Sequence, residues 1–186
     1  MKSYLFFRRI SLLIVVIIGI TGCMNSNDRL ENSVLKQWVG KEMSFSDLVF
    51  TIKGKDTIYF NTKNFEYLIF SYVDYSDCIS CKLRLYAWKE LINEYEDRFP
   101  HRIGFVLYYC PKSPKDIIYF LEKEDFEYPI CIDTTNKMDS IFNFPIQFQF
   151  QTYLIKNNKV IGVGNPIFNP QVKALYDSIL MDKKNE

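Results

Sequence analysis

The sequence predicts an α/β fold in which a central mixed β-sheet is flanked by helices. Two nearly continuous apolar runs, Tyr67–Val73 and Ile103–Tyr109, are typical of strands that are buried on both faces. Between them lies a helical pattern that ends near Asp97, with one apolar stripe at alternating spacings of four and three residues. That stripe consists of Cys81, Leu85, Trp88, Ile92 and Tyr95. A strand, a helix and a second strand in this order predict a right-handed βαβ crossover.

Length and composition support one globular domain and exclude several protein classes. The chain has 186 residues, of which 48% are hydrophobic and 17% aromatic, so it can bury a core and is neither disordered nor collagen-like. It carries 23 Lys and Arg residues against 22 Asp and Glu residues. This balance lacks the basic field that binds phosphate backbones, so we expect no nucleic-acid partner.

Residues 1–22 are predicted to be a signal peptide. Basic residues precede the apolar run 10–20, which is too short to span a bilayer. The run ends in Ile20-Thr21-Gly22-Cys23, which resembles the lipobox of bacterial lipoproteins, where the cysteine is diacylated and becomes the new N-terminus. The alternative is an ordinary cleavage site followed by a chance cysteine. Cleavage before Cys23 would leave a mildly acidic mature chain.

A lipid on Cys23 would attach the protein to a membrane of the cell envelope, where it would face the periplasm. Cysteines can oxidise in this compartment. Met24, and not Asp, follows Cys23. By the sorting rule of some Gram-negative bacteria, this residue favours the outer membrane over the inner membrane.

The segments before the first buried strand are predicted to be peripheral. Residues 23–39 are largely polar and show no strong period, so we expect a tether. Residues 40–66 are predicted to form an N-terminal β-hairpin extension, because the β-rich stretches Asp47–Lys53 and Thr57–Phe60 flank a turn signal at Gly54. The main domain is then expected over residues 67–186.

The second half of the chain continues the α/β order. The second buried strand ends at Cys110-Pro111. The elements predicted after it are a helix over Asp116–Lys123 opened by Ser113-Pro114, a short strand over Tyr128–Ile132, one or two helical turns over Lys137–Phe142, a hairpin of Thr152–Lys156 and Val160–Val163, and a final helix from Asn169-Pro170 to about Met181.

A Cys-x-x-Cys motif, Cys78-Ile79-Ser80-Cys81, stands where the first buried strand turns into its helix. A cysteine at the first turn of a helix lies among unpaired N–H groups and at the positive end of the helix dipole, which lowers its thiol pKa. We therefore assign Cys78 as the nucleophile. Cys81 belongs to the buried stripe, so it should be shielded and should act as the resolving thiol.

This arrangement resembles the thioredoxin superfamily, and more narrowly the TlpA/ResA-like extracytoplasmic thiol-disulfide oxidoreductases. The resemblance spans roughly residues 67–180 and includes Tyr128-Pro129-Ile130-Cys131-Ile132-Asp133, similar to an inserted strand of that branch, and 152–160, similar to its closing hairpin. It implies a thioredoxin-like fold and a lipid-anchored enzyme without a cofactor. Its implied partners are thiols or disulfides of exported proteins outside the cytoplasm, and a redox partner that the sequence does not identify.

Two features depart from the family pattern. Asp77 stands where relatives usually carry Trp, and its negative charge should raise the thiol pKa of Cys78. The family's cis-proline aligns with Phe150, and the nearest proline is Pro145. Because a non-proline cis bond costs about 2.5 to 4 kcal/mol, we expect a trans bond at Phe150. Phe150 and Pro145 are then the candidates for an altered substrate-pairing edge.

The sequence leaves the roles of Cys110 and Cys131 open. Both are expected on neighbouring strands near the carboxyl edge of the sheet. They are either two buried free thiols or a structural disulfide, which needs a Cα separation of about 4.4 to 6.8 Å. A zinc site of four thiolates with Cys78 and Cys81 is a further alternative, but the second Cys-x-x-Cys is missing, so we expect no metal.

Two basic residues are interpreted as surface residues. His101, the only histidine, is predicted in a loop far from the motif, which argues against a His-based triad there, and a single histidine excludes a His-rich metal site. Lys82 follows the motif directly and could favour the Cys78 thiolate. We interpret it as an exposed helix lysine.

Three function classes remain. The first is a thiol-disulfide oxidoreductase that uses Cys78 and Cys81. The second is a redox-inactive binding module of thioredoxin fold in which these two cysteines form a structural disulfide. The third is a peroxidase, but the Pro-x-x-x-Thr-x-x-Cys pattern of peroxiredoxins is absent before Cys78.

Overall fold

The computed structural model describes residues 26–45, 47–74 and 82–182. The signal peptide, Cys23, Asp77, Cys78 and Cys81 lie outside the described residues. The chain divides into two compact units, Met1–Ser33 and Val34–Glu186. Helix α2 (Ser26–Trp38) crosses this boundary, and the description below concerns the second unit.

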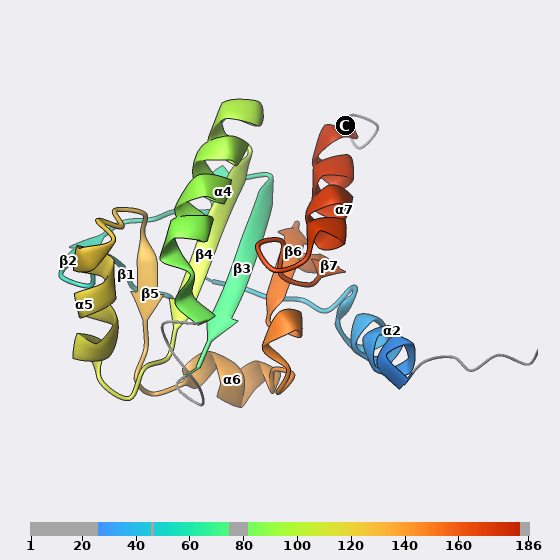
Figure 1. Ribbon diagram of the computed structural model, residues 1–186, viewed down its shortest axis with the longest axis horizontal. Helices are drawn as coiled ribbons and strands as arrows, with labels where there is room; N and C mark the ends of the chain where they lie inside the picture. Colours follow the sequence, from blue (N-terminus) through green and yellow to red (C-terminus); the bar gives the residue numbers. More distant parts are fainter. Residues whose placement is uncertain (1–25, 46, 75–81, 183–186) are drawn as a thin grey trace, which may run out of the picture. The chain divides into compact units, whose positions relative to one another are not determined.

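A seven-stranded mixed sheet in the order β2-β1-β5-β4-β3-β6-β7 forms the centre of this unit (Figure 1). The parallel strands β3, β4 and β5 lie side by side, and antiparallel strands extend the sheet at both edges. The strand bounds are β1 Phe50–Ile52, β2 Asp56–Ile58, β3 Tyr67–Val73, β4 Ile103–Tyr109, β5 Ile130–Ile132, β6 Thr152–Lys156 and β7 Lys159–Val163. The predicted α/β class and mixed sheet are confirmed.

Side chains of β3 alternate between two apolar clusters, as expected for a strand that is covered on both faces. Tyr67, Ile69 and Val73 join the cluster formed with α4 (Leu85–Arg98), α5 (Pro114–Lys123) and α7 (Pro170–Met181). Leu68, Phe70 and Tyr72 join the cluster on the other face, to which α6 (Lys137–Phe142) and the end of α2 contribute. All seven residues of β3 are buried, so the prediction of a central strand is confirmed.

Helix α4 buries the described part of the predicted stripe, which consists of Leu85, Trp88, Ile92 and Tyr95, and it buries Leu91 as well. The helix does not run without interruption from the motif. Arg84 adopts a left-handed conformation with φ 41°, which separates the helical residues 82–83 from α4. This conformation costs a non-glycine residue about 1 to 2 kcal/mol, so tertiary contacts must hold it.

The N-terminal hairpin is confirmed as β1 and β2, which pair antiparallel. Gly54 lies in its turn with φ +70°, and a Cβ at this position would approach Cγ1 of Ile118 to 2.7 Å. Glycine is therefore required both for the conformation and for the close approach of the turn to α5. β1 also pairs with β5, so the hairpin extends the main sheet.

Part of the segment that we expected to be an irregular tether, residues 23–39, is helical and buried. Residues 26–38 form α2, and within the second unit Val34 and Trp38 are buried in the core. The chain then runs along β7: the amide of Gly40 donates to the carbonyl of Val160 at 2.8 Å, and the amide of Val160 donates to Lys41 at 3.0 Å. We call residues 34–45 the strap.

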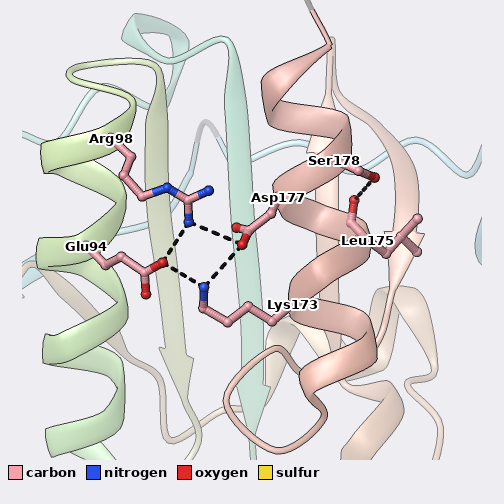
Figure 2. A network of polar contacts seen from close by, with 6 residues as sticks. All are labelled: Glu94, Arg98, Lys173, Leu175, Asp177 and Ser178. Atoms are coloured by element: carbon pink, nitrogen blue, oxygen red, sulfur yellow. Dashed lines mark hydrogen bonds and ion pairs between the residues drawn. The ribbon is translucent and has the colours of Figure 1, made fainter.

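A closed ring of ion pairs joins α4 to α7 (Figure 2). Glu94 accepts from Arg98 and from Lys173, both at 2.7 Å. Asp177 contacts the same two cations at 3.2 Å. The ring fixes the two helices beside each other on one face of the sheet. Among the described residues, no helix is long and apolar enough to cross a membrane.

Candidate functional site

The carboxyl ends of the three parallel strands form one level edge. Val73 is the register partner of Tyr109, which in turn pairs with Ile132, so β3, β4 and β5 all end at the same height. Ligand and catalytic sites of α/β sheets lie outside such an edge. Asp74 follows β3 and is the last described residue before the segment that holds Cys78 and Cys81.

Asp74 and Lys82 border that segment and form an ion pair. The Nζ atom of Lys82 donates to Oδ1 of Asp74 at 2.8 Å, and the two side chains are 8% and 23% exposed. Asp74 is the residue after β3, and Lys82 is the residue after Cys81. Lys82 is therefore buried, and our interpretation of it as an exposed helix lysine was wrong. Sequence reasoning did not anticipate this burial, because Asp74 lies eight positions before Lys82 and not at the i,i+3 or i,i+4 spacing of side-chain pairs on a helix.

Arg84 links the start of α4 to two other loops. Its guanidinium carbon lies 5.3 Å from the ring centroid of Phe168, which is close enough for a cation–π interaction. Phe168 also contacts Phe148 edge-on at 5.1 Å between centroids. These contacts connect α4 with the loop before α7 and with the loop before β6, and they help to hold the left-handed conformation of Arg84.

The loop before β6 contains the two candidates for the substrate-pairing edge. Every peptide bond of the described residues is trans, as expected for Phe150. Phe150 ends a short 3₁₀ helix, η2 (Phe148–Phe150), and packs partly buried against the apolar cluster that contains Phe70 and Tyr72. The carbonyl of Pro145 accepts a hydrogen bond from the side-chain amide of Gln151 at 2.7 Å. Ile146, in the same loop, is 93% exposed. Sequence reasoning did not single out this exposed apolar side chain.

Cys110 and Cys131 are both buried, and the structure holds them as free thiols. Cys131 is the register partner of Tyr108, two residues before Cys110. Two residues along a strand and one strand across correspond to a Cα separation of roughly 8 Å, beyond the range of a disulfide. Of the two alternatives for this pair, the structure therefore has the free thiols, at the predicted carboxyl edge.

The surroundings of Cys110 and Cys131 keep them protonated. Burial, with the negative charges of Asp133 and Asp74, raises the pKa of Cys110 to about 11. Burial and Asp133 raise the pKa of Cys131 to about 12. Since the thiolate is the nucleophile, neither cysteine is suited to thiol exchange at neutral pH.

Polar side chains near the edge are held by hydrogen bonds to one another. Tyr72 donates to the side-chain oxygen of Asn136 at 2.9 Å, and Tyr108 donates to Asp133. Burial acts in the opposite direction, but hydrogen bonds from Thr135 and Tyr108 lower the pKa of Asp133. Asp133 is therefore ionised, and it also accepts a hydrogen bond from the amide of Lys137, the first residue of α6, at 3.0 Å.

His101 lies where the sequence predicted it, in the loop before β4. Its side chain is 90% exposed and contacts Glu96 at 3.1 Å. This loop precedes β4, whereas Cys110 follows β4. His101 therefore lies at the amino ends of the parallel strands, opposite to the carboxyl edge. Within residues 26–45, 47–74 and 82–182, no cluster of three or more His, Cys, Asp or Glu side chains could hold a metal ion.

No protein-family model matches the chain, and no curated protein matches its sequence. Solved structures match its fold. A protein assigned as the thiol:disulfide interchange protein DsbE of Chlorobium tepidum has a TM-score of 0.55 at 16% identity, over 76% of this chain and 95% of its own.

Two further solved structures have the same fold. A protein assigned as a thiol-disulfide oxidoreductase of Bacteroides vulgatus has a TM-score of 0.54 at 17% identity, over 75% of this chain and 90% of its own. The reduced 2-Cys peroxiredoxin of Plasmodium vivax has a TM-score of 0.57 at 15% identity, over 80% of this chain and 84% of its own.

Proposed function

We propose that this chain, which has a thioredoxin-like fold, is a lipid-anchored thiol-disulfide oxidoreductase that acts on exported proteins through Cys78 and Cys81. One observation carries the proposal. The Cys-x-x-Cys sequence begins five residues after the carboxyl end of β3, a parallel strand in the interior of the sheet. This is the edge at which sites of α/β sheets lie, and a redox-active pair needs to be open to a protein partner there.

Thiol-disulfide exchange at this pair would take two displacements. The Cys78 thiolate attacks one sulfur of the partner's disulfide, so that a mixed disulfide forms and the partner's other sulfur leaves as a thiolate. The Cys81 thiolate then attacks Cys78, which releases the partner's second thiolate and forms the Cys78–Cys81 disulfide. Two electrons pass to the partner. The proposal then requires a dithiol protein to reduce the Cys78–Cys81 disulfide, because the proposed reaction uses no other source of electrons.

The two cysteines that the structure describes, Cys110 and Cys131, support this division of roles. Burial and nearby carboxylates hold Cys110 and Cys131 as protonated thiols. The motif cysteines are therefore the candidates for thiol-disulfide exchange. Cys78 is predicted at the start of a helix, and Cys81 is predicted on the buried stripe.

The proposed location is the periplasmic side of the cell envelope, with the lipid on Cys23 as the anchor. The positive start, the short apolar run and the Ile20-Thr21-Gly22-Cys23 sequence support this placement. Met24 supports the outer membrane over the inner membrane. An oxidising compartment is also the setting in which a disulfide-exchange protein has substrates.

The alternative is a binding module whose Cys78–Cys81 disulfide is structural. The loop before β6 favours this alternative: Phe150 packs inward, and the Pro145 carbonyl accepts a hydrogen bond from Gln151. A substrate strand would therefore meet a different edge from the one that the family pattern implies. A peroxidase is a weaker candidate: the fold is shared with a peroxiredoxin, but the peroxiredoxin sequence pattern is absent before Cys78.

Insulin reduction tests the proposal directly. The full-length chain in detergent should accelerate reduction of insulin disulfides by dithiothreitol, and Cys78→Ser should abolish the acceleration. Cys110→Ser is the matched control, because it removes a thiol from the same sheet edge but should leave the rate unchanged. A wild-type chain that does not exceed the uncatalysed rate would favour the binding module.

A further inference from the structure

Lys41 of the strap contacts two different elements at once. Its backbone carbonyl accepts a hydrogen bond from the amide of Val160 in β7 at 3.0 Å. Its Nζ atom donates to the carbonyl of Phe142, the last residue of α6, at 2.9 Å and lies 4.0 Å from the centroid of the Trp38 ring. The ammonium group thus satisfies a carbonyl at a helix end and gains a cation–π interaction. Lys41 therefore joins the strap to α6 as well as to the sheet.

Helix α6 depends on contacts of this kind, because its six residues are too few for a helix to be stable by itself. Left-handed asparagines flank it, Asn136 with φ 55° and Asn143 with φ 53°. The side chain of Asn136 does not cap the first turn, and within the helix Met138 is the buried residue. The hydrogen bond from Lys41 therefore supports the C-terminal end of a helix that has little stability of its own.

The other end of α6 lies against the carboxyl edge of the sheet. Asn136 accepts a hydrogen bond from Tyr72 at 2.9 Å, and the amide of Met138 donates to the hydroxyl of Tyr108 at 3.3 Å. Burial raises the pKa of Cys110, and a hydrogen bond from the backbone of Asn136 acts in the opposite direction. The start of α6 is thus in contact with the Cys110 thiol, which is buried. Opening of α6 would expose this thiol.

Cys131 is buried in the same apolar cluster but lies against a different segment. Burial raises the pKa of Cys131, and a hydrogen bond from the backbone of Val49 acts in the opposite direction. Val49 directly precedes β1, which pairs with β5 through Thr51 and Ile130. Opening of the strap and α6 would leave this pairing in place. Cys131 should therefore stay covered when Cys110 becomes exposed.

We propose that the strap and α6 form one clasp, which opens and closes as a unit with Lys41 as its link, and that opening of the clasp uncovers the carboxyl edge at Cys110. Local units of this kind open at a lower free energy than the whole protein unfolds. A partner or a force that displaces the strap from β7 would thereby loosen the carboxyl edge as well. The inference does not rest on the chemistry proposed for Cys78 and Cys81.

The test is the rate at which N-ethylmaleimide labels each buried thiol in the native full-length chain in detergent. Digestion and mass spectrometry of the peptides that contain Cys110 and Cys131 give the two rates separately. Lys41→Met should raise the rate at Cys110 by about tenfold, because it removes one hydrogen bond from a charged donor, and should not change the rate at Cys131. Lys41→Arg keeps a cationic donor and should stay near the wild type. Lys36→Met is the matched control, because Lys36 is an exposed lysine of the same strap.

A second variant tests the coupling from the other end of α6. Tyr72→Phe removes the hydroxyl that donates to Asn136. In the closed strap, the amide of Gly40 donates to the carbonyl of Val160 at 2.8 Å. If the clasp opens as a unit, Tyr72→Phe should speed hydrogen exchange at the Gly40 amide and labelling of Cys110 by the same factor, because one opening step governs both.

Equal increases at Cys110 and Cys131 in Lys41→Met would indicate global unfolding and would overturn the inference. An unchanged rate at Cys110 in this variant would overturn it as well, and so would faster labelling of Cys110 in Tyr72→Phe without faster exchange at Gly40. These outcomes leave the proposed oxidoreductase activity untouched, because insulin reduction tests that activity separately.

Discussion

The indole ring of Trp38 lies 4.5 Å from the phenol ring of Tyr153, measured between ring centroids. Trp38 also stacks on Phe144 at 5.5 Å and is fully buried. The strap is thus part of the aromatic core on one face of the sheet.

We predict that Trp38→Ala lowers the free energy of unfolding by about 3 to 5 kcal/mol, because it leaves a large cavity against Tyr153 and Phe144. Chemical denaturation followed by circular dichroism would measure the change. Val39→Ala is the control, since Val39 is 51% exposed and its truncation should change the free energy of unfolding by less than about 0.5 kcal/mol. A Trp38 variant as stable as this control would contradict the packing.

The mature protein is predicted to begin at an acylated Cys23. Mass spectrometry of the membrane fraction should show a lipid-modified N-terminal peptide, and Cys23→Ser should leave an unprocessed or mislocalised precursor. A soluble mature form that starts at another residue would contradict the prediction.

Cys81→Ala is predicted to trap a mixed disulfide between Cys78 and a partner protein, because the resolving thiol is missing. Cys78→Ala should trap none. Non-reducing electrophoresis of envelope extracts would detect the trapped species. Faster alkylation of Cys81 than of Cys78 in the reduced protein would reverse the assignment.

Cys110 and Cys131 should both be alkylated in unreduced, denatured protein and neither in native protein at pH 8. Their folded pKa values of about 11 and 12 lie above the value of about 8.5 for a free thiol. The protonated form therefore stabilises the fold fully below about pH 8.5 and loses this contribution as the pH rises toward 11 and 12. Unreduced, denatured protein that remains unlabelled at both residues would indicate a bond between them.

The ring of Glu94, Arg98, Lys173 and Asp177 should contribute modestly to stability. A double-mutant cycle with Glu94→Gln and Lys173→Met is expected to give a coupling energy of about 0.5 to 1 kcal/mol, because the ring is partly exposed. The coupling should shrink as salt increases. A coupling energy of zero at low salt would show that the ring does not stabilise the α4–α7 contact.

Much of the fold could be predicted because its elements have strong local patterns. Strands β3 and β4 are continuous apolar runs with bounds that match the prediction, and α4 buries the predicted stripe. The strap was missed because its apolar residues are sparse in a polar sequence and contact residues more than a hundred positions away, such as Phe144 and Tyr153.

The candidate site was predicted less completely, for a similar reason. The order of the elements predicts the direction of the strands. Strand direction in turn predicts that Cys110 lies at the carboxyl edge of the sheet. Burial of Lys82 depends on Asp74, and the inward packing of Phe150 depends on an aromatic cluster assembled from distant segments. No local pattern encodes these contacts.

The path of the strap along β7 bears on self-association. An uncovered edge strand offers free N–H and C=O groups to any neighbouring chain. On this protein the strap hydrogen-bonds to Val160 and bridges Lys159 through Glu42, so β7 is already occupied. The opposite edge is β2, a strand of three residues that includes the exposed Asp56. If a lipid on Cys23 holds copies close together on a membrane, as proposed, they would therefore find little open strand through which to add to one another's sheets.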